Sequence, residues 1–183
     1  MKYTHLILSL LILAGCSQKP AAVKKYYRLE LPSQQLQNSK QHPSALWIKK
    51  PEAHSILGNR PMVATDAAGA LQQLSHHAWI ESPKILIHEL LRQQLQNQWQ
   101  MTYSKRPKSE EYHQLHSRIL ANEKNNNQAL IRIEFTLYDM YMEQVNHQTI
   151  ASKQTIQGDD YAAFATAMSQ ALQTVIAQLE LTP

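Results

Sequence analysis

Leu130-Ile131-Arg132-Ile133-Glu134-Phe135-Thr136-Leu137-Tyr138 is the stretch that says most about the fold of this 183-residue chain. From Ile131 to Leu137 apolar and polar side chains alternate, with Arg132, Glu134 and Thr136 outward, which predicts a strand with one buried and one solvated face. A second extended run follows at about 141–156, with an expected interruption at Asn146-His147. The simplest structure for two such runs is a pair of long antiparallel strands. Another element must then pack against their apolar face.

Two amphipathic helices are expected to provide that cover. Gly158-Asp159-Asp160 predicts a helix start, with both carboxylates at the positive end of the helix dipole. Ser82 and Pro83 predict an earlier helix, from about 83 to 99, with the serine as N-cap and the proline at the first helical position. Each helix has one apolar stripe: Ile87, Leu91, Leu95 and Trp99 in the first, and Tyr161, Phe164, Met168, Ala171, Leu172, Val175 and Leu179 in the second.

The remaining segments are shorter or more polar. The polar, glutamine- and asparagine-rich segments 33–43 and 103–128 are expected to be loops, the second with at most a short element near 112–120. Together, the expected strands and helices predict a two-layer α+β domain, in which two main amphipathic helices pack on one face of a mostly antiparallel mixed β-sheet. Short strands are expected at 26–31, with Tyr27, Leu29 and Leu31 on one side, at 45–48, and in a hairpin of 61–65 with 70–74.

The N-terminus has the pattern of an export signal. A short positive region, 1–5, precedes the apolar run 6–13, which is far shorter than the ~20 residues of a membrane-spanning helix. Leu13-Ala14-Gly15-Cys16, which contains the single cysteine of the chain, resembles the lipobox of bacterial lipoproteins. This resemblance implies cleavage between Gly15 and Cys16, a thioether-linked diacylglycerol on the Cys16 sulfur and an acyl chain, such as palmitate, on its new amine.

The lipobox divides the chain into a signal peptide at 1–15, a lipidated tether at 16–25 and one domain at 26–183. Two or three acyl chains would give durable attachment, whereas a single chain gives marginal binding. Ser17 replaces the aspartate that favours inner-membrane retention in enterobacterial lipoproteins, so the same resemblance points to the periplasmic face of the outer membrane. The alternative is an ordinary secreted protein with an incidental cysteine.

The sequence offers no group of residues with the spacing of a catalytic or cofactor site. Neither a phosphate-binding glycine loop nor a Gly-x-Ser-x-Gly elbow is present, and the one cysteine is assigned to lipid. His113-x-x-His116 and His76-His77 are pairs without further ligands, and His88-Glu89 lacks the second histidine of a zinc-protease motif. We therefore expect no enzyme, no metal and no cofactor other than the lipid on Cys16.

The distribution of charge and of aromatic residues indicates which classes of partner to expect. The net charge of +4 is scattered along the chain, which, with the export signal, argues against nucleic acid. Trp47, Trp79 and Trp99 either pack in the core or line a lipid-binding surface or an oligomer interface. The lysines near the tether could attract anionic headgroups weakly, although a solvated linker is the favoured explanation.

The order of short motifs along the chain resembles the ABC-type transport auxiliary lipoprotein family, and within it the lipoprotein subunits of paraquat-inducible (Pqi) systems. The resemblance covers nearly all of the mature chain, and the asparagine- and glutamine-rich insertion around 105–128 departs from it. It rests on the lipobox followed by Tyr26-Tyr27-Arg28-Leu29, Leu46-Trp47-Ile48-Lys49-Lys50-Pro51, Arg60-Pro61-Met62-Val63, His77-Ala78-Trp79-Ile80-Glu81-Ser82-Pro83 and Gly158-Asp159-Asp160-Tyr161-Ala162-Ala163-Phe164.

The resemblance implies a non-enzymatic envelope component that contributes to envelope integrity. Its expected partner is a periplasm-spanning protein of the MCE class anchored in the inner membrane, with which it would form a route for lipid between the membranes. A ring-like homo-oligomer is also expected. Two rival hypotheses remain: a structural or assembly lipoprotein without a transport role, and a ligand- or metal-binding lipoprotein that uses His113 and His116.

Overall fold

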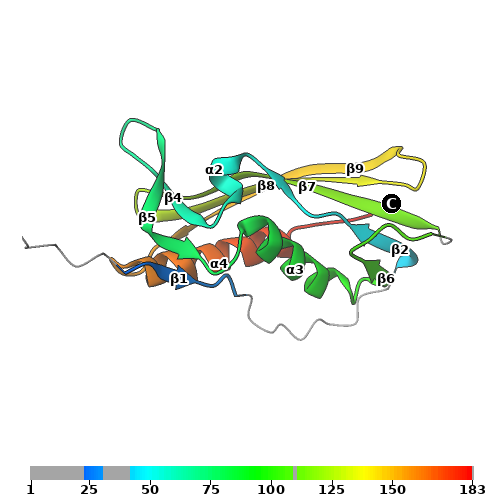
Figure 1. Ribbon diagram of the computed structural model, residues 1–183. Coiled ribbons are helices and arrows are strands. Elements are labelled where there is room, and N and C mark those ends of the chain that lie inside the picture. The colour runs from blue at the N-terminus through cyan, green and yellow to red at the C-terminus, as the bar shows by residue number, and fades with distance from the viewer. Residues whose placement is uncertain (1–22, 31–41, 109–110, 183) are drawn as a thin grey trace, which may run out of the picture.

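The computed structural model describes residues 23–30, 42–108 and 111–182 of the chain (Figure 1). The expected signal peptide, Cys16, most of the tether and Leu31 lie outside these residues. The elements are β1 (Lys25–Tyr27), β2 (His42–Ile48), β3 (Glu52–Ala53), α2 (Ser55–Gly58), β4 (Pro61–Thr65), β5 (Leu71–Trp79), α3 (Pro83–Leu95), β6 (Trp99–Tyr103), β7 (Tyr112–Asn125), β8 (Gln128–Tyr138), β9 (Gln144–Thr155) and α4 (Tyr161–Ala177).

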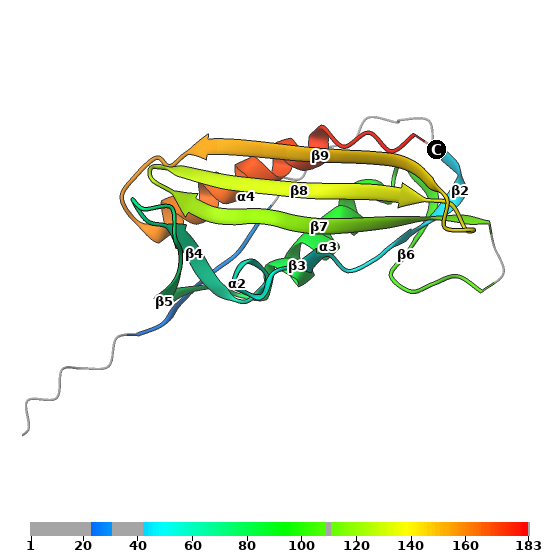
Figure 2. The same ribbon diagram turned by 90° about the horizontal axis from the view of Figure 1, so that it is seen from above.

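Three long antiparallel strands form the main part of the sheet, as Figure 2 shows. The alternating stretch at 130–138 is β8, and Ile133 on it pairs with Ile119 on one side and approaches Ile150 on the other. All three isoleucines are buried. The predicted long strands with one apolar face are therefore confirmed.

The expected break in the third strand is wrong, because β9 runs without interruption through Asn146 and His147. The inward polar side chains are accommodated by the C-terminal tail. Gln148 donates a hydrogen bond of 2.6 Å from its Nε2 atom to the carbonyl of Glu180, and the Asn146 amide lies 3.5 Å from the carbonyl of Thr182. Polar residues can face inward here because the tail supplies their partners.

The largest error concerns 103–128, which was expected to be loop. It contains β7, a 14-residue strand that pairs with β8 on one side and with β2, β3 and β4 on the other. Its polar sequence was typical of a loop, yet several of its polar side chains are buried and hydrogen-bonded. The Thr65 hydroxyl donates to the Glu123 carboxylate at 3.0 Å, and the Asn122 amide donates to the carbonyl of Leu57 at 3.5 Å. A turn follows at Asn126, whose φ of 51° suits asparagine.

The shorter strands follow the predictions with shifted ends. The hairpin of β4 and β5 is confirmed, and Asp66 stabilises its turn by accepting hydrogen bonds from two backbone N–H groups, those of Ala68 and Ala70. β5 continues to Trp79, five residues beyond the predicted end at 74, and β2 begins at His42 instead of 45. β1 has three residues, and the buried Leu29 follows it outside the strand.

The helices begin where the sequence predicted. Asp160 is the N-cap of α4, and its Oδ1 atom accepts a hydrogen bond of 2.8 Å from the Ala163 N–H. Ser82 is the N-cap residue of α3, although its side chain makes no cap bond. α3 ends at Leu95, so the predicted extension to Trp99 is wrong: the chain turns at 96–98, and Trp99 is fully buried as the first residue of β6.

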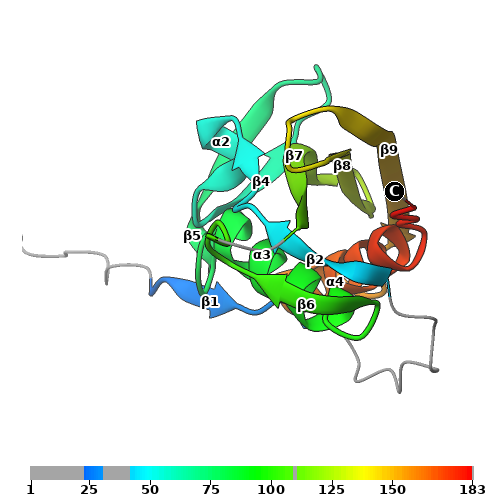
Figure 3. The same ribbon diagram turned by 90° about the vertical axis from the view of Figure 1, so that its right-hand side faces the viewer.

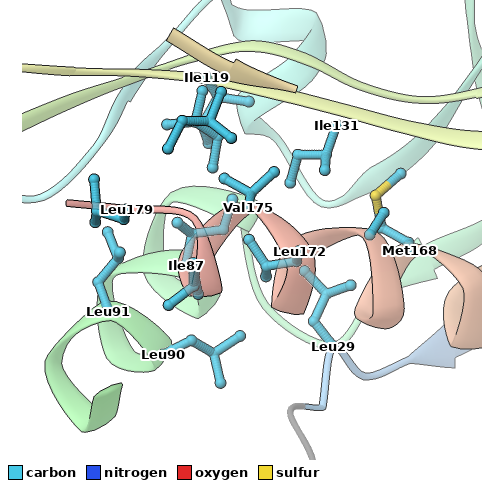
Figure 4. Close-up of a cluster of buried hydrophobic side chains, with 14 of the residues drawn as sticks. Leu29, Ile87, Leu90, Leu91, Ile119, Ile131, Met168, Leu172, Val175 and Leu179 are labelled. Carbon is cyan, nitrogen blue, oxygen red and sulfur yellow. The ribbon is translucent and has the colours of Figure 1, made fainter. Parts of the chain in front are cut away.

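Both long helices cover the same side of the sheet (Figure 1), and the sheet curves around α4 when seen end-on (Figure 3). The core lies between these layers, where Ile87 of α3 and Leu172 and Val175 of α4 meet the sheet residues Ile119 and Ile131 (Figure 4). All five are fully buried, which contributes about 1.5–3 kcal/mol for each side chain. The predicted two-layer α+β architecture is confirmed.

The sheet is more mixed than its three long strands suggest. Among the described residues, β7 to β9 and the β4–β5 hairpin are antiparallel, whereas β1–β5, β2–β6 and the pairings of β7 with β2, β3 and β4 are parallel. The antiparallel ladders are far the longer. Trp79 and Trp99 are core residues, while Trp47 is half-buried with the Lys49 ammonium 5.7 Å from its ring.

Candidate functional site: the tether end of the domain

The described chain begins at one end of the domain, beside the β4–β5 hairpin and the first turn of α4 (Figure 1). β1 joins the sheet there by pairing in parallel with β5, so that Lys25 lies opposite His77 and Tyr27 opposite Trp79. Beyond the strand, Leu29 enters the core. Cys16 precedes the first described residue, Val23, by a segment that spans at most roughly 25 Å when extended.

A cluster of aromatic rings holds β1 against the domain. The Tyr27 hydroxyl is hydrogen-bonded to Nδ1 of His77 at 3.1 Å, and the His77 ring stacks on Tyr161 with 3.8 Å between centroids. The Lys124 ammonium lies 5.7 Å from the Tyr161 ring. One imidazole therefore joins β1, β5 and the first residue of α4.

The same cluster favours neutral side chains. Burial lowers the pKa of His77 from its usual value of 6.5, and Lys25 and His76 lower it further. Burial raises the pKa of Tyr27 above 10.0, with a smaller contribution from Asp160. The hydrogen bond and ring stacking of Tyr27, His77 and Tyr161 make this cluster a structural contact between strand and helix.

A groove of about 650 Å³ lies between β1 and α4. Small side chains line its helical wall, among them Ala162, Ala165 and Ser169. Ser169 also fixes the chain after β1, because its hydroxyl accepts a hydrogen bond of 3.1 Å from the Glu30 N–H and donates one of 2.9 Å to the Ala165 carbonyl. The segment that leads from the tether is thus bonded to both the sheet and the helix.

The histidine pairs considered as metal ligands occupy separate environments. His113 and His116 are three residues apart on β7, so strand alternation directs them to opposite faces. His113 is hydrogen-bonded to the Ser44 hydroxyl at 3.0 Å, and His116 packs edge-on against Tyr138. Burial lowers the pKa of both imidazoles.

His88 on α3, which was also considered as a metal ligand, is hydrogen-bonded through Nε2 to the Ile48 carbonyl at 3.0 Å. Across residues 23–30, 42–108 and 111–182, no three histidine, cysteine, aspartate or glutamate side chains gather as a metal-binding group. Gly15 and Cys16, the predicted cleavage and lipidation site, lie outside these residues. None of the helices described is both long and apolar enough to cross a bilayer.

Comparison with known proteins identifies the family. The sequence profile of the ABC-type transport auxiliary lipoprotein component family matches residues 27–180, nearly the whole described domain. The chain belongs to this family. This is a family of auxiliary lipoprotein components of ABC-type transport, and membership in it suggests association with a membrane.

Solved structures share the fold. A crystal structure of the protein XCC0632 from Xanthomonas campestris superposes with a TM-score of 0.75 at 17% identity, over 84% of this chain and 91% of that one. A second crystal structure, of an uncharacterized protein, gives a TM-score of 0.67 at 16% identity, over 85% and 95% of the two chains. None of the curated proteins matches the sequence.

Sequence reasoning did not find the Tyr27–His77–Tyr161 cluster. Its members lie far apart in the chain, and each belongs to a segment whose pattern is explained by its own strand or helix. The parallel pairing of β1 with β5 brings them together, and this pairing has no local signal in the sequence.

Proposed function

We propose that this protein is a non-enzymatic auxiliary subunit of a Pqi-type MCE system for lipid transport between membranes, anchored by lipid on Cys16 to the periplasmic face of the outer membrane. The observation that carries the proposal is the family match over residues 27–180, which begins shortly after the lipobox-like Leu13-Ala14-Gly15-Cys16. A transport auxiliary domain and a lipidation signal thus occur in the expected order in one chain.

The structure supports a role in docking better than one in chemistry. Its polar side chains at the tether end are used to fix β1 to β5 and α4, as the bonds of Tyr27 and Ser169 illustrate. The partner in this proposal is an MCE-domain protein anchored in the inner membrane, whose distal end meets this domain. The subunit contributes to envelope integrity through that contact, and it works as a homo-oligomer.

Affinity purification from gently solubilised envelopes tests the proposal. The protein carries a C-terminal tag and is compared with a Cys16→Ala variant expressed at the same level. We expect an MCE-domain protein to co-purify with the wild type, and its recovery to fall when the anchor is lost. Recovery of cell-wall or outer-membrane assembly proteins alone would favour the rival structural lipoprotein and overturn the transport role.

Chemical crosslinking of the same detergent extract tests the homo-oligomer. A ladder of crosslinked species that ends at a defined size is expected. A monomer throughout would contradict this part of the proposal without affecting the partner.

A further inference from the structure

The outward side of β1 and its neighbours form an exposed surface that combines apolar and basic residues. The Arg60 guanidinium lies over the Tyr26 ring, 5.0 Å from its centroid, and Arg60 also hydrogen-bonds the Trp79 carbonyl at 3.4 Å. Ile80 follows Trp79 and donates a backbone hydrogen bond to Tyr27. We call this surface the tether face; it consists of Val23, Lys24, Tyr26, Arg28, Arg60 and Ile80.

The apolar members of the tether face are open to solvent. Val23 is 81% exposed, Tyr26 is 54% exposed and Ile80 is 39% exposed. Tyrosine is favoured at the boundary between water and lipid because its ring is apolar and its hydroxyl is polar. These three side chains therefore suit a surface that is apolar within and polar at its rim.

The charged members of the tether face are all basic. Lys24, Arg28 and Arg60 are exposed. Carboxylates lie around its edge: Glu30 and Glu89 line the same hollow of about 350 Å³ as Arg28 and Ile80, the Glu81 carboxylate accepts a hydrogen bond of 2.7 Å from the Ser82 N–H, and Asp160 lies near Tyr27 on the other side of β1. Basic residues next to an exposed tyrosine complement an anionic bilayer surface.

The course of the chain indicates which surface is within reach. Val23 is the first described residue, and the segment before it leads to Cys16 within at most roughly 25 Å. If Cys16 carries the acyl chains of the proposed function, the tether face is held at high local concentration beside the leaflet that contains them. This step rests on the proposed function.

We propose that the tether face binds the anionic phospholipid headgroups of the leaflet in which Cys16 is anchored. Tyr26, Val23 and Ile80 sit in the headgroup region, and Lys24, Arg28 and Arg60 around them contact phosphates. The domain then stands with β1 toward the bilayer. The turn between β8 and β9 lies at the opposite end of the long strands (Figure 1), so it points away from the membrane and toward the periplasm.

Vesicle binding by the mature chain, residues 16–183 with Cys16→Ser, tests this surface without the anchor. This chain keeps every member of the core, which begins at Leu29. We expect co-sedimentation with vesicles of mixed phosphatidylglycerol and phosphatidylcholine, no binding to phosphatidylcholine alone, and loss of binding in high salt. Arg28→Gln with Arg60→Gln should lower the partition coefficient roughly fivefold per charge, about 25-fold for the pair.

The opposite end of the domain supplies a matched control. Lys105 and Lys108 are exposed there, so Lys105→Gln with Lys108→Gln removes the same charge from another surface. This pair should change the partition coefficient less than about twofold. Equal losses from both pairs, or no binding to the anionic vesicles, would overturn the proposal. Unchanged circular dichroism would show that each variant is folded.

The readouts separate this inference from the proposed function. Acylation of Cys16 in cells, measured with a labelled palmitate, is independent of vesicle binding by the Cys16→Ser chain. Acylation without vesicle binding would overturn the tether-face proposal alone. Vesicle binding without acylation would overturn the proposed anchor and leave a membrane-binding surface.

Discussion

Replacing Asp160 by alanine should destabilise the domain measurably, because this carboxylate begins the helix around which the sheet curves. Its Oδ1 atom accepts the Ala163 N–H at 2.8 Å. Loss of an N-cap acceptor costs ~1 kcal/mol. Loss of negative charge at the positive end of the helix dipole adds ~0.3–1 kcal/mol. The free energy of unfolding should therefore fall by about 1.5 kcal/mol.

Two neighbouring variants separate the hydrogen bond from the charge. Asp160→Asn keeps a cap acceptor and removes the charge, so it should cost only the dipole share. Asp159→Ala removes the same charge one residue earlier, where the carboxylate makes no cap bond to α4 in the described structure. It should lower the free energy of unfolding by roughly a few tenths of a kcal/mol.

Urea unfolding of the mature Cys16→Ser chain measures these differences. The midpoint should shift at constant slope, since the variants expose the same surface on unfolding. The melting temperature of Asp160→Ala should fall by roughly 3–6 °C. Equal stabilities of Asp160→Ala and Asp159→Ala would refute the assignment of Asp160 as the N-cap.

The other predictions concern β7, a half-buried histidine and a turn. Ile119→Ala should lower the free energy of unfolding by about 2–5 kcal/mol in urea because this side chain is fully buried, whereas Leu120→Ala, at a half-buried position, should cost less than half as much; equal small effects would indicate that 112–125 is a surface loop. Burial lowers the pKa of His116 below 6.5, so the unfolded chain takes up the proton first, and the stability present above pH 6.5 is lost as the pH falls toward the native pKa. His116→Gln should make the free energy of unfolding depend less on pH between about pH 8 and pH 5, while His77 and His113 still contribute, and an unaltered pH profile would count against this. Gly158→Ala should destabilise by more than about 1 kcal/mol, because φ is +124° and the new Cβ would lie 3.2 Å from that of Ala163; a thermal melt identical to wild type would contradict this strain.

The segments that were predictable are those whose local pattern and final environment agree. The strand at 130–138 was visible because Ile131, Ile133, Phe135 and Leu137 alternate with polar residues and are all buried in the core. The start of α4 was visible because Asp160 is both a good N-cap residue and the cap in the structure. The structure of such segments can be predicted from a few neighbouring residues.

The errors arose where long-range contacts decide the structure. β7 contains buried polar residues such as Asn122 and Glu123, whose partners come from α2 and β4, so its polar sequence resembled a loop. Trp99 continued the four-residue spacing of α3, yet it is buried from a strand after an intervening turn. Neither outcome can be read from a window of sequence.

The candidate site was predictable only in its covalent part. Cys16 was singled out because a lipobox is a contiguous motif, and its lipidation stays a prediction. The tether face and the cluster around His77 required the pairing of β1 with β5, which joins residues about fifty positions apart. Exposed residues such as Tyr26 and Arg60 have no periodic signal that would associate them in advance.

The anchor at Cys16 is the central claim, because the orientation of the domain and its place in lipid transport both depend on it. The most direct test is the intact mass of the protein recovered from separated inner and outer membranes. The account predicts a chain that begins at Cys16, carries diacylglycerol and an amide-linked acyl group, and is found in the outer membrane. An unmodified Cys16, cleavage at another position, or recovery only from the inner membrane would contradict it.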